Sequence, residues 1–292
     1  MAKGLLIKGY NGFYYVESAG EIWTCSLRGR FRIKNQDFLA GDHVEFTKLE
    51  HPKGVIEKVY DRTNQLVRPA VANVEKALVT FAFANPQPDF LLLDRILIQV
   101  LFQRVTPVIC FNKRDLVDEA TAAAVMKPYQ DAGFETVAVS AGENRGIETL
   151  KEKLDGRIVV LAGPSGVGKS SILNRIDSGF CLATGALSRK TERGRHTTRR
   201  VELLPLGNST YIADTPGFSA LYLPEELKKE ELAAYYPEFA EAALYCRFTS
   251  CLHDREQDCE VKNDVAEGIL DKGRYQRYCT FLNELKEREG KY

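Results

Sequence analysis

The chain reads Gly163-Pro164-Ser165-Gly166-Val167-Gly168-Lys169-Ser170 at the point that decides its fold. This is the phosphate-binding loop pattern G-x-x-x-x-G-K-S. The apolar run at residues 158–162 suits a buried parallel strand, and residues 171–176 can begin a helix. A glycine-rich turn before a helix is the alternative, but the strand, the pattern and the helix together argue against it. The stretch therefore predicts a nucleotide-binding α/β domain.

The predicted loop offers several kinds of contact to a nucleotide. Its backbone N–H groups, with the helix N-terminus behind them, form a nest for phosphate oxygens. Lys169 is expected to reach the β- and γ-phosphates, and the Ser170 hydroxyl is expected to bind Mg²⁺. We assign Ser171, the next residue, to the same binding site.

A strand, a helix and a second strand are predicted upstream, at residues 76–84, 89–104 and 106–111. This is the βαβ unit of a parallel sheet. The second strand leads into Asn112-Lys113-Arg114-Asp115, the pattern N-K-x-D, at the edge where open α/β sheets bind ligands. Alone, N-K-x-D is by default a surface turn. Near a phosphate loop it predicts recognition of a base.

The chemistry of this second motif points to guanine. The Asp115 carboxylate can accept from N1–H and the N2 amine of guanine, whereas adenine offers neither donor. Asn112 is expected to hold the loop and Lys113 to cover the base plane. We expect the strand ends near residues 112 and 162 to lie side by side, so that one nucleotide spans both motifs.

Two further helices and a strand separate the two motifs. Helices are predicted at residues 120–131 and 146–154, and a short strand at residues 136–139. Ser140-Ala141 follows that strand, where a backbone N–H can contact guanine O6. A lone Ser-Ala pair is weak on its own, and only its position makes it part of the predicted site.

Residues 178–200, after the phosphate-loop helix, form a locally basic loop. A segment that orders around the γ-phosphate and Mg²⁺ is typical of GTPases. Thr198 is expected to be the second protein ligand of Mg²⁺, with Thr197 as the other candidate. A disordered basic loop without a ligand role is the alternative.

A hairpin of residues 201–206 and 210–213 leads into Asp214-Thr215-Pro216-Gly217. Asp214 can hold Mg²⁺ through water, and the Gly217 N–H can bind the γ-phosphate. In an ordinary GTPase the phosphate loop comes first, followed by D-x-x-G and then N-K-x-D. In this chain N-K-R-D comes before both the phosphate loop and D-T-P-G. The order predicts a circularly permuted GTPase, which the same sheet permits because termini lie at the surface.

Residues 1–68 have a different pattern, with short candidate strands at 4–8, 13–16, 22–27, 43–47 and 55–60. Five short strands punctuated by glycine and proline predict a small barrel of the OB type. Such barrels bind nucleic acid through their loops and one face. A basic stretch around Phe31 is a candidate contact, and a solvated hairpin loop is the alternative; its residues are Arg28, Arg30, Arg32 and Lys34.

Residues 224–292 are mainly helical by pattern and contain C-x4-C-x-H-x5-C. Three thiolates and an imidazole predict a closed tetrahedral Zn²⁺ site of the structural type. Unrelated thiols and a surface histidine are the alternative, and Cys279 is a weaker rival to the histidine. The predicted ligands are Cys246, Cys251, His253 and Cys259.

The bulk composition sets the limits of these interpretations. A chain of 292 residues suits two or three domains, and its formal net charge of zero gives no general argument for nucleic acid. No apolar run approaches the roughly 20 residues needed to span a bilayer, and the apolar core within residues 1–8 is too short for a signal peptide. We therefore expect a cytoplasmic, reduced protein with no membrane partner.

Together, the barrel, the permuted motif order, G-R-H-T-T at residues 194–198 and the C-x4-C-x-H-x5-C cluster resemble the RsgA family of ribosome-small-subunit-dependent GTPases. The resemblance implies an OB barrel at 1–68, a permuted α/β GTPase domain at 69–223 and a zinc domain at 224–292. It implies GTP hydrolysis stimulated by the small subunit, late in that subunit's maturation. It also implies rRNA contacts from the two outer domains, and we expect a monomer.

Phe218 stands where many GTPases carry the glutamine that orients water. The family pattern suggests His196 for this role, so the expected catalytic residues are His196, Lys169 and Thr198. Two alternatives remain at this point. One is a GTP-gated rRNA-binding scaffold in which hydrolysis is only a release signal. The other is a small-metabolite kinase, in which N-K-R-D would be accidental.

Overall fold

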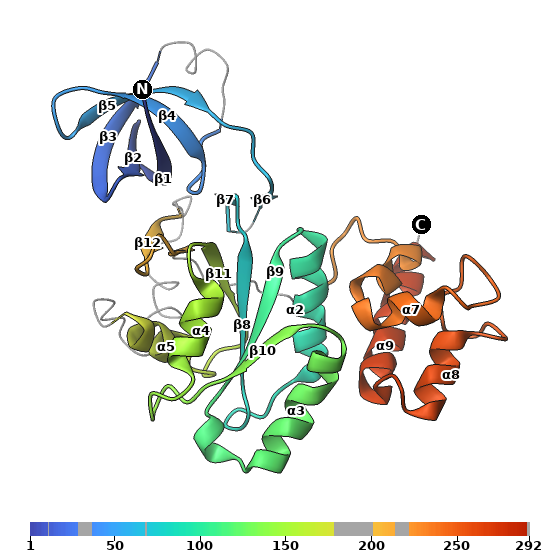
Figure 1. The fold of residues 1–292 in the computed structure, drawn as a ribbon. Helices are drawn as coiled ribbons and strands as arrows, with labels where there is room; N and C mark the ends of the chain where they lie inside the picture. Colours follow the sequence, from blue (N-terminus) through green and yellow to red (C-terminus); the bar gives the residue numbers. More distant parts are fainter. Residues whose placement is uncertain (11, 29–36, 68, 178–200, 214–221, 291–292) are drawn as a thin grey trace.

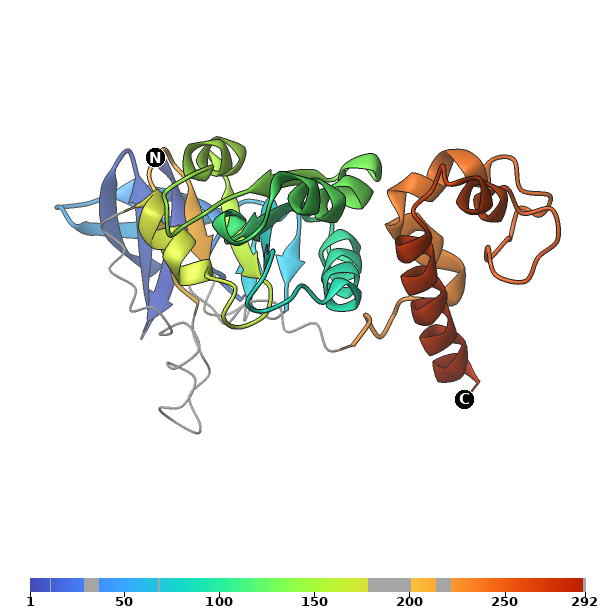
Figure 2. The ribbon, with the colours of Figure 1, turned by 90° about the horizontal axis from the view of Figure 1, so that it is seen from below.

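The computed structural model describes residues 1–10, 12–28, 37–67, 69–177, 201–213 and 222–290. Three bodies follow one another along the chain (Figure 1). The N-terminal barrel and the C-terminal helical domain lie at opposite ends of the central α/β domain, as Figure 2 shows from a second direction.

The N-terminal body is a closed barrel in the strand order β1-β2-β3-β5-β4. β3 pairs in parallel with β5, and the other neighbouring strands are antiparallel. Leu6, Val16, Phe46 and Ile56 fill its interior and are fully buried. The five predicted strands are confirmed, with bounds β1 (Ala2–Tyr10), β2 (Phe13–Ser18), β3 (Glu21–Leu27), β4 (His43–Lys48) and β5 (Lys53–Val59).

The basic stretch around Phe31 is described only at its beginning. Arg28 donates to the Glu57 carboxylate on the barrel wall. Arg30, Phe31, Arg32 and Lys34 lie outside the described residues, so their predicted nucleic-acid contact stays a prediction.

The central body is a six-stranded sheet in the order β10-β9-β8-β11-β13-β12. All neighbours are parallel except the β12–β13 pair, which is the predicted hairpin. The strands are β8 (Lys76–Ala82), β9 (Thr106–Asn112), β10 (Glu135–Ala138), β11 (Ile158–Ala162), β12 (Leu203–Pro205) and β13 (Tyr211–Ala213). A short ribbon of β6 (Gln65–Leu66) and β7 (Val71–Ala72) connects the barrel to this sheet.

Helices cover both faces of the sheet. One core cluster packs α2 (Phe90–Phe102) and α3 (Glu119–Asp131) against it, and another packs α4 (Ile147–Leu154) and α5 (Lys169–Ile176). Because both faces are covered, β11 is buried at every residue, as its continuous apolar sequence predicts. Asp89 begins α2 by accepting the Leu92 N–H at 2.9 Å.

The expectation that the strands ending near residues 112 and 162 are adjacent is wrong. β8 lies between β9 and β11 and pairs with both along its length. All three strands nevertheless run in parallel and end at the same edge of the sheet. The loops that follow β9 and β11 can therefore meet across the end of β8.

The C-terminal body consists of short helices around α9, with Tyr236, Phe239, Tyr278 and Phe281 in its core. Ile98 of α2 belongs to the same cluster, so this core continues onto the central domain. The elements are η3 (Lys229–Tyr235), η4 (Pro237–Phe239), α7 (Ala240–Ala243), α8 (Glu260–Glu267) and α9 (Lys272–Glu289). Among the described residues, no helix has both the length and the apolar character needed to cross a membrane.

Candidate functional site

The phosphate loop has a backbone that only glycine fits at two positions. Gly163 and Gly168 have φ angles of 120° and 95°, in the region that other residues avoid. A Cβ atom on Gly163 would lie 2.0 Å from the Thr80 carbonyl oxygen, and one on Gly168 would lie 2.3 Å from Asn112 Nδ2. The loop after β11 therefore folds closely over the end of β8 and reaches the N-K-R-D motif.

Lys169 lies inside the curve of this loop. Its ammonium donates to the carbonyl oxygens of Gly163 at 2.8 Å and Pro164 at 2.6 Å. Burial lowers the pKa of Lys169 to about 8, because the charged form loses hydration. Lys169 is also the first residue of α5, whose cap residue Gly168 offers no side chain to the free N–H groups. A buried cation and the N–H groups of a helix N-terminus together favour a polyanion at this position.

Asn112 joins the three predicted motifs. It is 2% exposed at the end of β9. Its Nδ2 donates to the Val167 carbonyl oxygen of the phosphate loop at 2.8 Å. Its Oδ1 accepts the Ala141 N–H at 3.1 Å, in the loop after β10. The phosphate, base and Ser-Ala motifs thus form one continuous site, although the strands that carry two of them are not adjacent.

Of the other N-K-R-D side chains, those of Asp115 and Lys113 lie at the candidate site, whereas that of Arg114 is bound elsewhere. Ser140 Oγ donates to Asp115 Oδ1, which fixes the orientation of the exposed carboxylate. Lys113 donates to the Gly166 carbonyl oxygen at 3.0 Å and also to that of Asn85, so it extends along the phosphate loop. Arg114 instead donates to Val117 at 2.6 Å and to Glu119. Its guanidinium is therefore bound within its own turn, and only its backbone stays at the site.

Several predicted site residues lie outside the described residues. These are the catalytic candidate His196, the Mg²⁺ candidates Thr197 and Thr198, and the D-T-P-G residues Asp214 and Gly217. β13 ends at Ala213, directly before Asp214, and pairs with β11 in the sheet. β13 therefore ends at the same edge of the sheet as β11, which leads into the phosphate loop.

The C-terminal cysteines and histidine form a second candidate site. The ligand atoms of Cys246, Cys251, His253 and Cys259 all lie within 4.8 Å of one another. Tetrahedral Zn–S bonds of about 2.3 Å would place two sulfurs roughly 3.8 Å apart, and the Cys246 and Cys259 sulfurs are 3.8 Å apart. His253 Nδ1 is 3.4 Å from Cys259 Sγ. The donor set and its spacing fit one Zn²⁺ ion.

The surroundings of this cluster hold it in shape. Tyr275 and Tyr278 of α9 donate to the carbonyl oxygens of His253 and Leu252, each at 2.8 Å. Burial raises the pKa of the Cys259 thiol to about 12 and lowers the pKa of His253. Because the thiols must lose their protons to bind a metal, binding at this cluster would release protons and depend on pH. Cys279, the expected rival ligand, is not part of the cluster.

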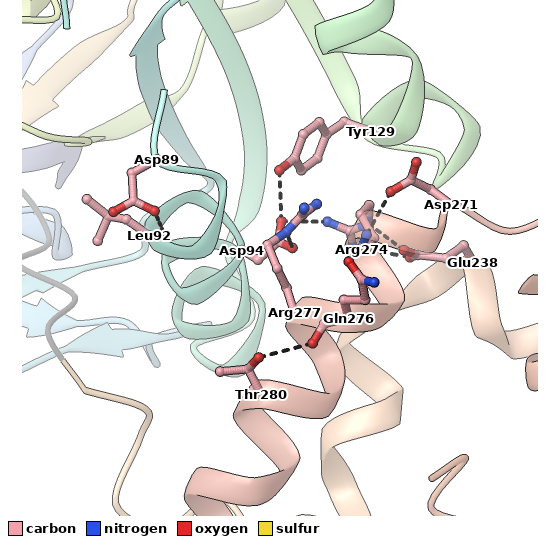
Figure 3. Close-up of polar contacts among 10 residues, drawn as sticks. All are labelled: Asp89, Leu92, Asp94, Tyr129, Glu238, Asp271, Arg274, Gln276, Arg277 and Thr280. Carbon is pink, nitrogen blue, oxygen red and sulfur yellow. Dashed lines mark hydrogen bonds and ion pairs between the residues drawn. The ribbon is translucent and has the colours of Figure 1, made fainter. Parts of the chain in front are cut away.

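One charged cluster has no counterpart among the sequence predictions. Arg274 of α9 donates to Asp94 of α2 at 2.8 Å and also binds Glu238, and all three side chains are nearly buried (Figure 3). Arg277 donates to the other Asp94 oxygen at 2.5 Å, and the Tyr129 hydroxyl donates to Asp94 at 3.0 Å. The sequence does carry a signal, because a carboxylate within the apolar run 90–98 needs a partner if it is buried.

Comparison with protein-family models gives two matches. The model described as RsgA GTPase matches residues 59–224, and the model described as RsgA N-terminal domain matches residues 3–56. Two curated relatives are named small ribosomal subunit biogenesis GTPase RsgA. The protein of Moorella thermoacetica is 47% identical, with 98% of each chain covered. That of Caldanaerobacter subterraneus subsp. tengcongensis is 44% identical over 98% of this chain and 97% of its own.

Solved structures agree with these matches. YjeQ from Thermotoga maritima is 35% identical with a TM-score of 0.84, covering 97% of this chain and 98% of its own. YloQ, described as a circularly permuted GTPase, is 33% identical with a TM-score of 0.84, covering 99% of this chain and 96% of its own. The predicted OB barrel, permuted GTPase domain and C-terminal Cys/His domain are confirmed. This chain belongs to the RsgA GTPase family of circularly permuted GTP-hydrolysing enzymes.

Proposed function

We propose that this chain hydrolyses GTP to GDP and phosphate while acting on the small ribosomal subunit during its biogenesis. The observation that carries this proposal is the double role of Asn112, which binds both the phosphate loop and the Ser-Ala loop. A single nucleotide bound at this edge meets the phosphate-binding and guanine-reading groups together. Family membership and the names of the relatives supply the ribosomal context.

The phosphates are bound by the loop and the first turn of α5. Lys169 contacts the β- and γ-phosphates, where its buried ammonium exchanges two carbonyl partners for anionic oxygens. The backbone groups around it hold the remaining oxygens. The residues of this part of the site are Gly163, Pro164, Ser165, Gly166, Val167, Gly168, Lys169, Ser170 and Ser171.

The base is read by the N-K-R-D and Ser-Ala segments. Asp115, oriented by Ser140, accepts the two guanine donors, and the Lys113 side chain lies along the base plane. A backbone N–H next to Ala141 donates to O6. Arg114 contributes its position in the turn, because its side chain is bound to Val117 and Glu119.

Hydrolysis depends on groups that precede and follow the β12–β13 hairpin. Ser170 and Thr198 would hold Mg²⁺, and Asp214 would hold it through water; such oxygen donors suit this hard cation. A bound Mg²⁺ neutralises charge between the β- and γ-phosphates. The Gly217 N–H binds the γ-phosphate, and His196 orients the attacking water, since Phe218 cannot.

The outer domains deliver the enzyme to its target. One structural Zn²⁺ held by the Cys246 cluster stabilises the C-terminal domain, and this domain and the barrel contact rRNA. We place the protein in the cytoplasm as a monomer, where the small subunit stimulates turnover. In the competing function, a GTP-gated scaffold, the subunit would bind without changing the hydrolysis rate.

The test measures GTP turnover with and without purified small subunits, together with co-sedimentation in GDP and in a non-hydrolysable GTP analogue. We expect several-fold faster turnover with subunits and nucleotide-dependent co-sedimentation. Nucleotide-dependent binding with an unchanged hydrolysis rate would support the scaffold instead.

In the same assay, His196→Ala should keep GTP affinity and lose the stimulated turnover. Unchanged stimulation would remove His196 from the mechanism.

Base recognition is tested separately with Asp115→Asn. The amide should lower GTP affinity by roughly two to four orders of magnitude, because guanine then faces a donor where it needs an acceptor. Xanthosine triphosphate, which offers a carbonyl there, should bind this variant better than GTP. Asp131→Asn, at the exposed end of α3, is the matched control. Equal GTP affinity for both variants would argue against the proposed base site.

A further inference from the structure

The Ser-Ala loop is held from two opposite sides. Asn112 accepts the Ala141 N–H at 3.1 Å. Arg175, in the last turn of α5, donates from Nε to the Ala141 carbonyl oxygen at 2.8 Å and from Nη2 to the Gly142 carbonyl oxygen at 3.3 Å. One guanidinium thus binds two consecutive carbonyl groups, a rigid arrangement that a single donor cannot reproduce.

These contacts fix the direction of the N–H groups in the loop. A peptide unit is planar and trans, so the N–H points away from the side on which the C=O lies. With the Ala141 oxygen on Arg175, the Gly142 N–H is directed away from the guanidinium. The next N–H, of Glu143, is bound by Ser140 Oγ at 3.1 Å. Within the described part of the chain, no hydrogen bond is found for the Gly142 N–H.

The Ser-Ala loop and α5 face each other across a hollow of about 420 Å³. Its lining residues are Ala141, Gly142, Ser171, Asn174 and Arg175. The helix that begins with Lys169 of the phosphate loop thus carries, six positions later in its last turn, the residue that holds the Ser-Ala loop.

We propose that Arg175 is a positioning residue for guanine recognition, which fixes the Ala141–Gly142 peptide so that the Gly142 N–H donates to O6 of guanine. This inference rests on the proposed function. Asp115 reads the N1 and N2 side of the base and Arg175 sets the donor at O6, so the two contacts are separable. Arg175 itself touches the loop and not the reacting phosphates.

The test compares Arg175→Ala with the wild-type chain for three nucleotides. GDP presents O6 and the 2-amino group, 6-thio-GDP replaces O6 by a poorer acceptor, and IDP lacks the 2-amino group. We expect Arg175→Ala to weaken GDP binding about three- to tenfold, the size of one hydrogen bond. The preference for GDP over 6-thio-GDP should shrink by the same factor, while the preference for GDP over IDP stays unchanged.

Two further variants separate positioning from general structure. Arg175→Lys keeps one donor and should restore part of the discrimination against 6-thio-GDP. Arg145→Ala removes another guanidinium near the same loop, one that pairs with the exposed Glu143, and should behave like wild type. All variants are checked for an unchanged thermal midpoint, since Arg175 is exposed apart from its two bonds.

The possible results are distinct. Loss of affinity for GDP, 6-thio-GDP and IDP by one common factor would show a purely structural role and overturn the inference. The inference would also be overturned if wild type selects guanine nucleotides but Arg175→Ala keeps the wild-type preference for GDP over 6-thio-GDP. A wild-type chain with no preference for guanine nucleotides would instead overturn the proposed function, and this inference with it.

Discussion

The two junctions that hold the outer domains to the central sheet differ in where their charges lie. At the barrel junction, Lys8 pairs with Glu202 at 2.7 Å, and the two side chains remain 36% and 42% exposed. At the junction with the C-terminal domain, Asp94 and Arg274 pair at 2.8 Å with exposures of 1% and 3%. The charges of the first pair remain partly hydrated, whereas those of the second pair are shielded from water.

Apolar packing is present at both junctions and does not distinguish them. Leu5 and Ile7 of the barrel strand β1 belong to the core of the central domain. Ile98 of α2 belongs to the core of the C-terminal domain. The difference therefore lies in the polar contacts, which decide how readily each junction can rearrange.

The two junctions suit different tasks: one holds a fixed geometry, and the other can rearrange. Buried charges fix one geometry, because any displacement leaves an ion unpaired in a dry environment. Exposed charges can separate and be solvated again at little cost. The polar contacts of the barrel fall on Glu202, just before β12, and on Tyr211 of β13, in the hairpin between the segments of Thr198 and Asp214. We therefore expect the C-terminal domain to move with α2, and the barrel contact to adjust to the nucleotide.

Removal of zinc should have the largest effect, and this effect should be confined to the C-terminal domain. Structural zinc sites contribute on the order of 10 kcal/mol of folding free energy at neutral pH. Chelation should release one Zn²⁺ per chain and increase amide hydrogen exchange in α8 and α9, while the barrel strands stay protected. Release of no metal, or unchanged exchange in the C-terminal domain, would contradict the assignment.

Asp94→Ala should come next, because it removes the anion shared by the buried Arg274 and the half-buried Arg277, and leaves Arg274 with Glu238 alone. Breaking such a network by removing one partner costs about 3–5 kcal/mol. We expect a lower urea midpoint and increased hydrogen exchange in both α2 and α9. Asp131→Ala, which removes an exposed carboxylate from α3, is the control and should stay close to wild type. Similar midpoints for the two variants would show that the network is not what holds the junction.

Tyr211→Phe should have a smaller effect at the barrel junction. The Tyr211 hydroxyl donates to Glu17 at 3.0 Å, and its loss should cost about 0.5–1 kcal/mol because the pair is partly exposed. Burial, with the hydrogen bond to Glu17, raises the pKa of Tyr211 to about 12.

The pH dependence of this contact has a definite sign. The folded state holds the Tyr211 proton more tightly than the unfolded state, so its contribution is present below pH 10 and is lost between about pH 10 and 12. Wild type should therefore lose stability relative to Tyr211→Phe across this range, measured by chemical denaturation. Parallel curves for the two chains would contradict the assigned contact.

Lys8→Glu should have the smallest effect, since exposed pairs contribute about 0–1 kcal/mol. The reversed charge faces Glu202, so the loss should grow at low salt and disappear at high salt. Lys8→Glu combined with Glu202→Lys should restore the wild-type midpoint. A large, salt-independent loss would show that this junction resembles the buried one and would remove the contrast.

The local motifs were predictable because each depends on residues close in sequence. The glycines of the phosphate loop, the pattern N-K-R-D and the spacing of the cysteine cluster all carry their chemistry within about fourteen residues, as loop and metal-site geometry require. The bounds of the barrel strands were close for the same reason, since period-two burial is local. The role of His196 stays a prediction, because it lies outside the described residues.

The features that were missed join residues far apart. The order of the sheet places β8 between the two motif strands, which the motif spacing does not reveal. Arg175 reads as an ordinary basic residue in the last turn of a helix, and only its bonds to the Ser-Ala loop show its position. Asp94 and Arg274 are 180 positions apart, and neither identifies the other.

By itself, then, the sequence determined which nucleotide, which metal and which three domains to expect, because backbone strain, ligand type and hydrophobic period are written in neighbouring residues. Tertiary structure alone decided which charges are buried and which stay in water. A charge becomes costly only when another element covers it, and the covering element can come from anywhere in the chain.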